Sequence, residues 1–242
     1  MFEVSAIITT HAEGELIRAS VESCLAAKKV FEEKFDLSIE VILVMDRPSS
    51  ATRKVVGSYS SGNVVFELDY GDQGMVRNEV VKRANGRYIA FLDGDDLWSE
   101  NWLVEAYKVA EENIGKCVVY PEFNWYFEDS SNILCQIDGQ VSSFDYEALR
   151  AVNLWDALCF CPKQIYLDYP FTKRRIVEGF AYEDWHWNRQ LFEANIVQKN
   201  AIDTIIFKRR RGGSQGSEAS KRGVMALPTE SCYYDFYDNA ES

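Results

Sequence analysis

Histidine is scarce in this chain of 242 residues, which contains only His11 and His186. A serine or cysteine nucleophile therefore has few bases available, and no nucleophile-elbow sequence is present. The cysteines are also scattered, without the paired CxxC spacing of zinc sites. They are Cys24, Cys117, Cys135, Cys159, Cys161 and Cys232. We expect reduced, buried thiols in a cytoplasmic protein.

Long apolar runs and positive charge are lacking as well. No apolar segment approaches the roughly 20 residues that span a bilayer, and Met1 leads into a strand-like segment without a signal-peptide pattern. The net charge of −12 argues against a nucleic-acid partner, because phosphate backbones bind positive surfaces. Two basic clusters, Lys173–Arg175 and Lys208–Arg211, depart from this balance. They are candidates to meet a diphosphate or, by peripheral association, the anionic inner face of a membrane.

What the chain does have is enough apolar surface for a large core, since 47% of its residues are hydrophobic. Its length suits one large α/β domain. The first half alternates strand and helix patterns, as a doubly wound sheet requires. We expect strands at 4–10, 39–45, 64–68 and 88–93, a helix at 13–28 with Ala19 on its inner face, and a helix at 75–84.

The most informative segment is Tyr88–Trp98, in which apolar residues lead into Asp93, Asp95 and Asp96. Such a run is typical of a buried strand, and open α/β sheets bind ligands at the carboxyl ends of their strands. Clustered carboxylates repel one another unless a cation or hydrogen-bond donors hold them. They suit Mg²⁺ or Mn²⁺ that bridges to substrate phosphates. An equal alternative on this segment alone is an acidic turn before a helix beginning near Ser99.

The other expected strands also end at polar residues, which are Thr9 and His11, then Asp46, then Asp69 and Tyr70. The carboxyl ends of parallel strands meet at one edge of a sheet. We therefore expect these residues and the acidic segment to surround one crevice.

Four segments together resemble the inverting nucleotide-sugar glycosyltransferases of family 2, which have the GT-A fold. They are 5–11 (SAIITTH), 40–46 (EVILVMD), 74–78 (GMVRN) and 86–96 (GRYIAFLDGDD), the last similar to the family's DxD-bearing strand. The resemblance is clear over about residues 4–112. It implies a single GT-A domain, with a mostly parallel, Rossmann-like mixed sheet flanked by helices. A nucleotide-sugar-binding half at about 1–112 would precede an acceptor-binding half at about 113–227 and an acidic aromatic tail at 228–242.

The resemblance implies a donor site at the first strand ends. Thr9, His11 and Asp46 would line the base and ribose, with Asp46 accepting the N3 proton of uracil. Arg77 would face the nucleotide or its phosphates. A helix-capping role for His11 and a solvated position for Arg77 are the alternatives. Met45 departs from the family, because a further aspartate is usual there.

The acidic segment would then divide into separate roles. The resemblance implies that Asp93 binds near the ribose and that Asp95 coordinates the metal. Asp96 would either support that metal site or cap the following helix.

The resemblance also assigns the general base. Glu183 and Asp184 look like the family's Glu-Asp pair, at the start of a helix that we expect to reach Glu193. Asp184 would be the base. The alternative is an ordinary acidic pair that the helix dipole favours.

A basic segment beyond this helix, 205–214, resembles a basic loop of the family. Matching on Ser214 places Arg209 on its arginine and Arg211 where histidine is usual. A guanidinium has no lone pair for a metal, so we expect Arg211 to pair with the diphosphate. The polar segment 212–223 has the composition of a mobile lid. A solvated basic turn is the alternative.

Together these features imply transfer of a sugar, with inversion, from a UDP-linked donor to a hydroxyl acceptor, assisted by Mn²⁺ or Mg²⁺ on Asp95. A glycan or lipid-linked saccharide acceptor in bacterial polysaccharide or lipopolysaccharide synthesis is the expected context. The departures at Met45 and Arg211 leave open a nucleotide-sugar-binding or scaffold protein without turnover. Nucleotidyl transfer is a third alternative, although no glycine-rich phosphate signature follows the first strand.

Overall fold

The computed structural model describes residues 2–140, 148–211 and 223–229. The strands in these ranges are β1 (Val4–Thr10), β2 (Ile39–Asp46), β3 (Val64–Leu68), β4 (Tyr88–Asp93), β5 (Leu97–Trp98), β6 (Cys117–Glu128), β7 (Asn132–Cys135), β8 (Phe160–Pro162), β9 (Phe180–Ala181), β10 (Val197–Arg210) and β11 (Met225–Ala226). The helices are α1 (Ile17–Phe35), α2 (Ser50–Gly57), α3 (Gln73–Arg83), α4 (Trp102–Glu112), α5 (Ala148–Ala151), α6 (Lys163–Asp168) and α7 (Glu183–Glu193), with 3₁₀ turns η1 (Gly14–Leu16) and η2 (Ile176–Glu178).

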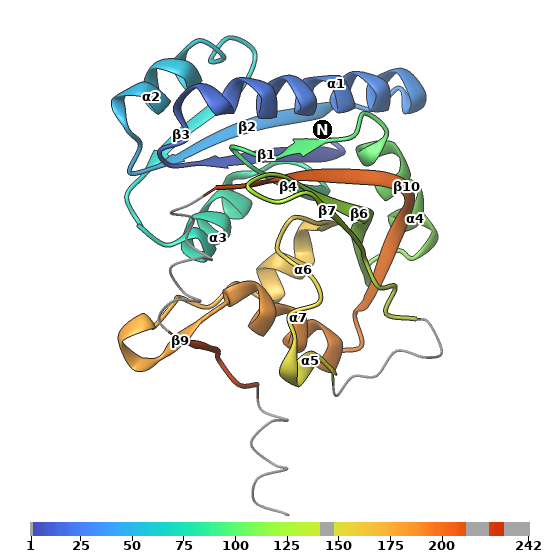
Figure 1. Cartoon of the computed structure of the whole chain (residues 1–242). Coiled ribbons are helices and arrows are strands. Elements are labelled where there is room, and N and C mark those ends of the chain that lie inside the picture. Colours follow the sequence, from blue (N-terminus) through green and yellow to red (C-terminus); the bar gives the residue numbers. More distant parts are fainter. Residues whose placement is uncertain (1, 141–147, 212–222, 230–242) are drawn as a thin grey trace, which may run out of the picture.

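A nine-stranded sheet forms the centre of the described structure. Its order is β3-β2-β1-β4-β8-β6-β10-β5, and β7 pairs with β6 at the side. Figure 1 shows α1 and α2 over one face of the first strands and α3 on the opposite face. A smaller sheet pairs β9 with β11. The predicted fold class, a mixed sheet flanked by helices, is confirmed.

The first four strands in the sheet order are parallel and lie between two layers of helices. Thr9 of β1 pairs with Val44 of β2 on one side and with Asp93 of β4 on the other. β1, β2 and β4 are buried along almost their whole length, which explains why they are largely apolar runs instead of alternating ones. The expected strand positions are confirmed, and the carboxyl ends of β1, β2 and β4 meet at one edge.

The first helix differs from the expected one. The chain makes the 3₁₀ turn η1 before α1, which continues to Phe35. The residues of α1 that face the core include Ile17, Val21 and Cys24, whereas Ala19 is exposed. Successive residues lie about 100° apart around a helix, so Ala19 lies about 200° from the buried Ile17. The prediction that Ala19 faces the core is therefore wrong.

The second half extends the same sheet. β6 runs in parallel with β10, while β7 and β8 pair in antiparallel fashion with their neighbours. The expectation of antiparallel strands in this half is therefore confirmed. Pro121 lies within β6, where the β6–β10 ladder changes register after Ala201. A proline fits there because it has no N–H to donate and the ladder is already interrupted.

Of the five cysteines in the described ranges, all are free thiols, and Cys135 alone among them is exposed. The expectation of reduced thiols is met for these five residues. The prediction that they are buried is wrong for Cys135. Cys232 lies outside the described residues. None of the described helices is long and apolar enough to cross a membrane.

The glycine before β4 fixes the position of this strand against β1. The Gly86 N–H donates to Ser5 Oγ over 2.8 Å, and this hydroxyl donates to Glu40 Oε1 over 2.5 Å. Ser5 and Glu40 are buried, so these bonds satisfy groups that would otherwise be costly. A Cβ on Gly86 would lie 2.3 Å from the Ser5 nitrogen. Only glycine therefore allows β4 to approach closely enough to place Asp93 beside Thr9.

We predict that Gly86→Ala lowers the free energy of unfolding by about 2–3 kcal/mol, because backbone must move to admit the methyl group. Urea denaturation would measure the loss. Gly57→Ala is the matched control, since a Cβ there has no heavy atom within 4 Å. Equal stability of the two variants would contradict the proposed close contact.

Candidate active site

One pocket of about 590 Å³ lies at the carboxyl ends of β1, β2 and β4, a volume within the usual range of small-ligand sites. Every residue predicted for the donor, metal and base positions lines it. These residues are Thr9, His11, Asp46, Arg77, Asp93, Asp95, Asp184, Arg209 and Arg211. The structure therefore brings together residues that are separated by up to two hundred positions in the sequence. Their individual roles stay predictions.

Asp46 and His11 join the first two strand ends to the loop after β3. The Asp46 carboxylate accepts the N–H of Tyr70 over 2.7 Å and that of Gly71 over 2.8 Å. Gly71 has a φ of +63°, which favours glycine. His11 Nδ1 lies 2.6 Å from the backbone oxygen of Asp46. His11 is exposed at the pocket, and α1 has no side-chain cap, so His11 does not cap this helix.

Asp93 is held by three donors that converge on one of its oxygens. Thr9 Oγ1, Gln73 Nε2 and Arg77 Nη2 donate to Asp93 Oδ1 over 3.0, 2.8 and 3.0 Å. Arg77 is only 3% exposed, and its guanidinium also lies over the rings of Phe91 and Phe171. The alternative of a solvated helix arginine is therefore wrong. Arg77 thus forms an ion pair with Asp93 while its own side chain is almost entirely buried.

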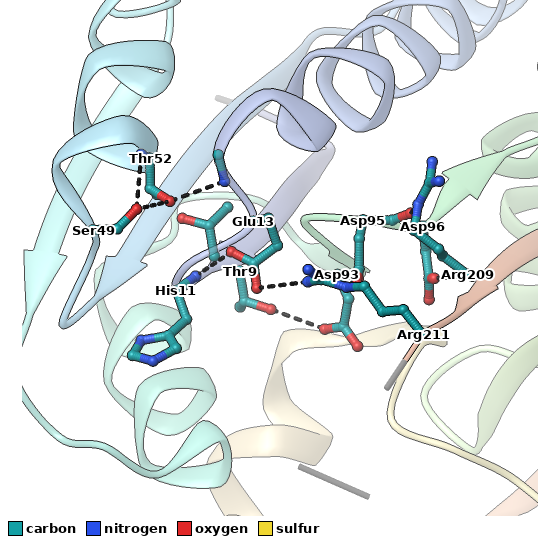
Figure 2. A network of polar contacts seen from close by, with 12 residues as sticks. Thr9, His11, Glu13, Ser49, Thr52, Asp93, Asp95, Asp96, Arg209 and Arg211 are labelled. Carbon is teal, nitrogen blue, oxygen red and sulfur yellow. Dashed lines mark hydrogen bonds and ion pairs between the residues drawn. The ribbon is translucent and has the colours of Figure 1, made fainter. Parts of the chain in front are cut away.

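Asp95 pairs with the residue that follows β10. Arg211 Nε and Nη2 each lie 3.0 Å from Asp95 Oδ2, and Figure 2 shows the guanidinium between Asp95 and Glu13. Burial raises the pKa of Asp95, the nearby Asp93 raises it further, and Arg211 opposes both effects. Burial thus opposes the charge of Asp95, and a neighbouring cation favours it.

Asp96 is buried against β10 and does not cap the following helix. Its Oδ1 accepts the Arg209 backbone N–H over 2.8 Å, and Lys208 Nζ lies 3.8 Å from Oδ2. The helix-cap alternative is wrong because β5 intervenes and α4 begins only at Trp102. Burial raises the pKa of Asp96 to about 7, and the Lys208 charge opposes this.

Lys208 and Asp156 line the pocket but were missed by the sequence reasoning. Lys208 Nζ donates to Asp156 Oδ2 over 2.7 Å, so a buried lysine connects Asp96 with Asp156. Burial lowers the pKa of Lys208, but the carboxylates of Asp156, Asp96 and Asp93 outweigh it and hold that pKa above its ordinary value. Thr204, Ile206 and Lys208 are buried in alternation along β10. This period of two was the available signal.

The basic segment forms a strand end instead of the expected loop, because β10 continues to Arg210. Arg209 Nε donates to the Asp95 backbone oxygen over 3.1 Å, and its guanidinium pairs with Glu128 and stacks on Phe127. Arg211 follows the strand and is the more accessible of the two, with 39% of its side chain exposed against 11% for Arg209. Ser214 and the lid-like segment at 212–222 lie outside the described residues.

The other basic cluster, at 173–175, is divided by the fold. Arg174 is fixed on the loop before α3, because its backbone N–H donates to Asp72 Oδ2 over 3.0 Å. Lys173 and Arg175 are exposed. Attachment to an anionic membrane through this cluster stays a prediction.

Asp184 lines the pocket from the first turn of α7, as expected. Asn153 Nδ2 donates to its Oδ2 over 3.1 Å, and the Trp185 N–H donates to Oδ1 over 2.8 Å. Burial raises the pKa of Asp184 to about 7, and the charges of Glu183 and Asp156 act in the same direction. A carboxylate with such a pKa can take up a proton near neutral pH.

The charge of the residues that line the pocket affects whether a divalent ion can bind there. The described lining residues include eight carboxylates and six cationic side chains, so an anionic diphosphate would meet a net negative pocket. No group of three or more His, Cys, Asp and Glu side chains is arranged as a metal site in the described ranges. Mg²⁺ often binds through one or two carboxylates plus substrate phosphates. Asp95 therefore fits an ion that arrives with a diphosphate.

We predict that Lys208→Met lowers the free energy of unfolding by on the order of 3 kcal/mol, because it leaves Asp96 and Asp156 without their buried cation. Adding Asp156→Asn should restore part of this loss by removing one unpaired charge. Urea denaturation checks both changes. Lys199→Met, on the same strand, is the control, and equal stability of the two single variants would refute a supporting role for Lys208.

Comparison with known proteins agrees with this arrangement. Residues 5–167 match the family described as glycosyl transferase family 2. WfaP of Escherichia coli, a UDP-Glc:alpha-D-GlcNAc-diphosphoundecaprenol beta-1,3-glucosyltransferase, is 32% identical over 97 residues, which cover 39% of this chain and 36% of WfaP. Glycosyltransferase GlyG of Streptococcus pneumoniae is 23% identical over 141 residues, covering 57% of this chain and 44% of GlyG. The chain thus matches less than half the length of either relative.

The fold is also that of a solved structure. TarS 1–349 of S. aureus, whose crystal structure contains UDP-GlcNAc, superimposes with a TM-score of 0.67 and 17% sequence identity. The superposition covers 89% of this chain and 61% of that chain. The predicted GT-A fold is confirmed. Because the family match covers more than half of its residues, the chain belongs to glycosyl transferase family 2.

Proposed function

We propose that this chain is the catalytic domain of an inverting glycosyltransferase that uses a UDP-linked sugar and a hydroxyl acceptor. The observation that carries the proposal is one pocket lined both by the nucleotide-side residues on the strand ends and by a half-buried acid, Asp184, on α7. The presence of UDP-GlcNAc in TarS and the name of WfaP support a UDP donor and an acceptor that is a glycan or a lipid-linked saccharide. Cell-envelope polysaccharide synthesis is the proposed context.

The donor's nucleotide would lie over β1 and β2. Each oxygen of Asp46 accepts one backbone N–H, which leaves a lone pair for the N3–H of uracil. The exposed His11 ring is available to stack on the base. The three donors to Asp93 all use Oδ1, so Oδ2 can accept from ribose hydroxyls.

The diphosphate would lie beside Asp95 and the end of β10. When bound there, Mn²⁺ or Mg²⁺ would neutralise charge on the departing diphosphate, with Asp95 as its protein ligand. Arg211 is the nearest accessible cation and would pair with phosphate oxygens. Arg209 holds the Asp95 backbone in place.

The chemical step needs a base on the opposite side of the sugar. Asp184 would accept the proton of the acceptor hydroxyl while that oxygen bonds to the anomeric carbon. The bond from this carbon to the diphosphate breaks in the same displacement and releases UDP, so the configuration is inverted. Asn153 and the Trp185 N–H orient the carboxylate of Asp184.

A nucleotide-sugar-binding protein without turnover is the second candidate. It is favoured by Arg211, whose guanidinium already occupies the carboxylate proposed for the metal. Such a protein would bind UDP-sugars but release no UDP from them with any acceptor or with water.

A thermal-shift screen tests the proposed donor. We predict that UDP and UDP-sugars raise the melting temperature more than CDP or GDP does, and that Mn²⁺ increases the effect. Binding at about 100 times Kd adds about 2.7 kcal/mol of apparent stability. Cytosine lacks the N3–H that Asp46 would accept, so Asp46→Asn should narrow the difference between UDP and CDP. A larger shift with GDP than with UDP would overturn the uridine assignment.

We predict that Asp184→Asn lowers the rate of UDP release from the UDP-sugar found in that screen about a hundred- to a thousandfold, because the amide cannot accept the hydroxyl proton. The Kd for UDP should stay within about twofold, since Asp184 lies away from the nucleotide side. An acceptor panel with an assay for released UDP measures the rate, and calorimetry measures the Kd.

The pH dependence separates a base from a structural acid. Because burial raises the pKa of Asp184 to about 7, the wild-type rate should rise as pH increases through about 7 and then level off. Asp184→Asn should lack this step. Full activity of the variant, or an unchanged pH step in it, would remove the base assignment.

A further inference from the structure

Each acid of the segment at the end of β4 is paired with its own cation. Arg77 pairs with Asp93, Arg211 with Asp95, and Lys208 approaches Asp96. Arg77 and Lys208 are buried, and each is fixed by further contacts. The Arg211 side chain is 39% exposed and follows the end of its strand. Arg211 is therefore the cation of this set that can be exchanged without opening the core.

The Arg211 guanidinium occupies the position where a metal would meet the protein. Its Nε and Nη2 both contact Asp95 Oδ2 at 3.0 Å, and Nη2 lies 3.9 Å from Glu13 Oε1 (Figure 2). A guanidinium has no lone pair to give a metal. A divalent ion on the same oxygen would also repel it. The two cations therefore exclude one another at Asp95.

We propose that Arg211 competes with the divalent ion for Asp95 and moves to the diphosphate when nucleotide and metal bind together. The inference rests on the proposed donor site. Phosphate oxygens offer the guanidinium the same two-pronged geometry as a carboxylate, so the exchange replaces one charge-assisted contact with another. A metal ion that binds without nucleotide offers Arg211 no new partner. Such an ion must therefore break the contact between Arg211 and Asp95.

Two consequences follow for binding. The free protein should bind Mn²⁺ weakly, and UDP should increase its Mn²⁺ affinity. Because coupling between two ligands is reciprocal, Mn²⁺ should increase the affinity for UDP by the same factor. Removing Arg211 should raise the affinity for Mn²⁺ alone and reduce this coupling.

The test is a titration of free Mn²⁺ by electron paramagnetic resonance, with and without UDP, on the wild type and Arg211→Gln. In the wild type, UDP should raise the Mn²⁺ affinity on the order of tenfold, within the usual range of coupling. In Arg211→Gln without UDP, the Mn²⁺ affinity should rise at least threefold, and the increase caused by UDP should be smaller. Melting curves confirm that each protein is folded.

Arg210→Gln is the matched control, since it removes the same charge from the adjacent residue, which stacks on Tyr126. It should leave the Mn²⁺ affinity without UDP nearly unchanged. Arg211→Lys keeps the positive charge but loses the paired N–H donors of the guanidinium. Its Mn²⁺ affinity without UDP should lie between those of the wild type and Arg211→Gln.

Two results would overturn the proposal, namely equal Mn²⁺ affinity of Arg211→Gln and wild type without UDP, or an equal increase in Arg210→Gln. If UDP binds to none of the proteins, the proposed donor fails. The Mn²⁺ titrations without nucleotide still decide whether Arg211 competes at Asp95.

Discussion

Repulsion among three carboxylates at the end of β4 is the constraint on which the arrangement of this pocket depends. Asp93, Asp95 and Asp96 lie within four residues, and burial raises the pKa of the last two. Cations that offset this repulsion reach the segment from α3 and from β10. β10 must therefore lie near the end of β4, and its pairing with β5 and β6 holds it there. The second half of the sheet thus completes a site that the first half begins.

The same constraint separates the two sides of the pocket chemically. On the strand-end side, Asp93, Asp95 and Asp96 each have a cation nearby. Asp184 lies across the pocket, where Asn153 and a backbone N–H donate to it but the nearest charges include Glu183 and Asp156. Burial and these charges outweigh the Trp185 N–H and Arg77, so the pKa of Asp184 rises to about 7. The pKa of Asp96 also rises to about 7, but Asp96 has the buried Lys208 beside it, whereas the donors to Asp184 are an amide and a backbone N–H.

The sequence allowed prediction of those features that local pattern determines. The first strands are buried on both faces, so their apolar runs marked their ends, and these ends located Thr9, Asp46 and Asp93. Contacts between distant segments were not accessible in this way. Asp96 accepts from the Arg209 N–H, 113 residues further along the chain, whereas the local sequence left it as either a support of the metal site or a helix cap. Lys208 was hidden for a similar reason, because it was counted in a basic cluster although alternation along β10 turns it inward.

Arginine at position 211 changes the balance of charge in the pocket when no donor is bound. A histidine side chain at this position would be largely neutral at pH 7. It would leave Asp95 and Glu13 beside Asp93 without a compensating charge. Burial already raises the pKa of Asp95 and of Glu13. The guanidinium reduces that repulsion, but it also contacts the carboxylate proposed to bind a divalent ion. A diphosphate resolves the conflict, since it attracts the guanidinium and supplies further ligands to the ion. The donor would then itself free the carboxylate that binds its metal.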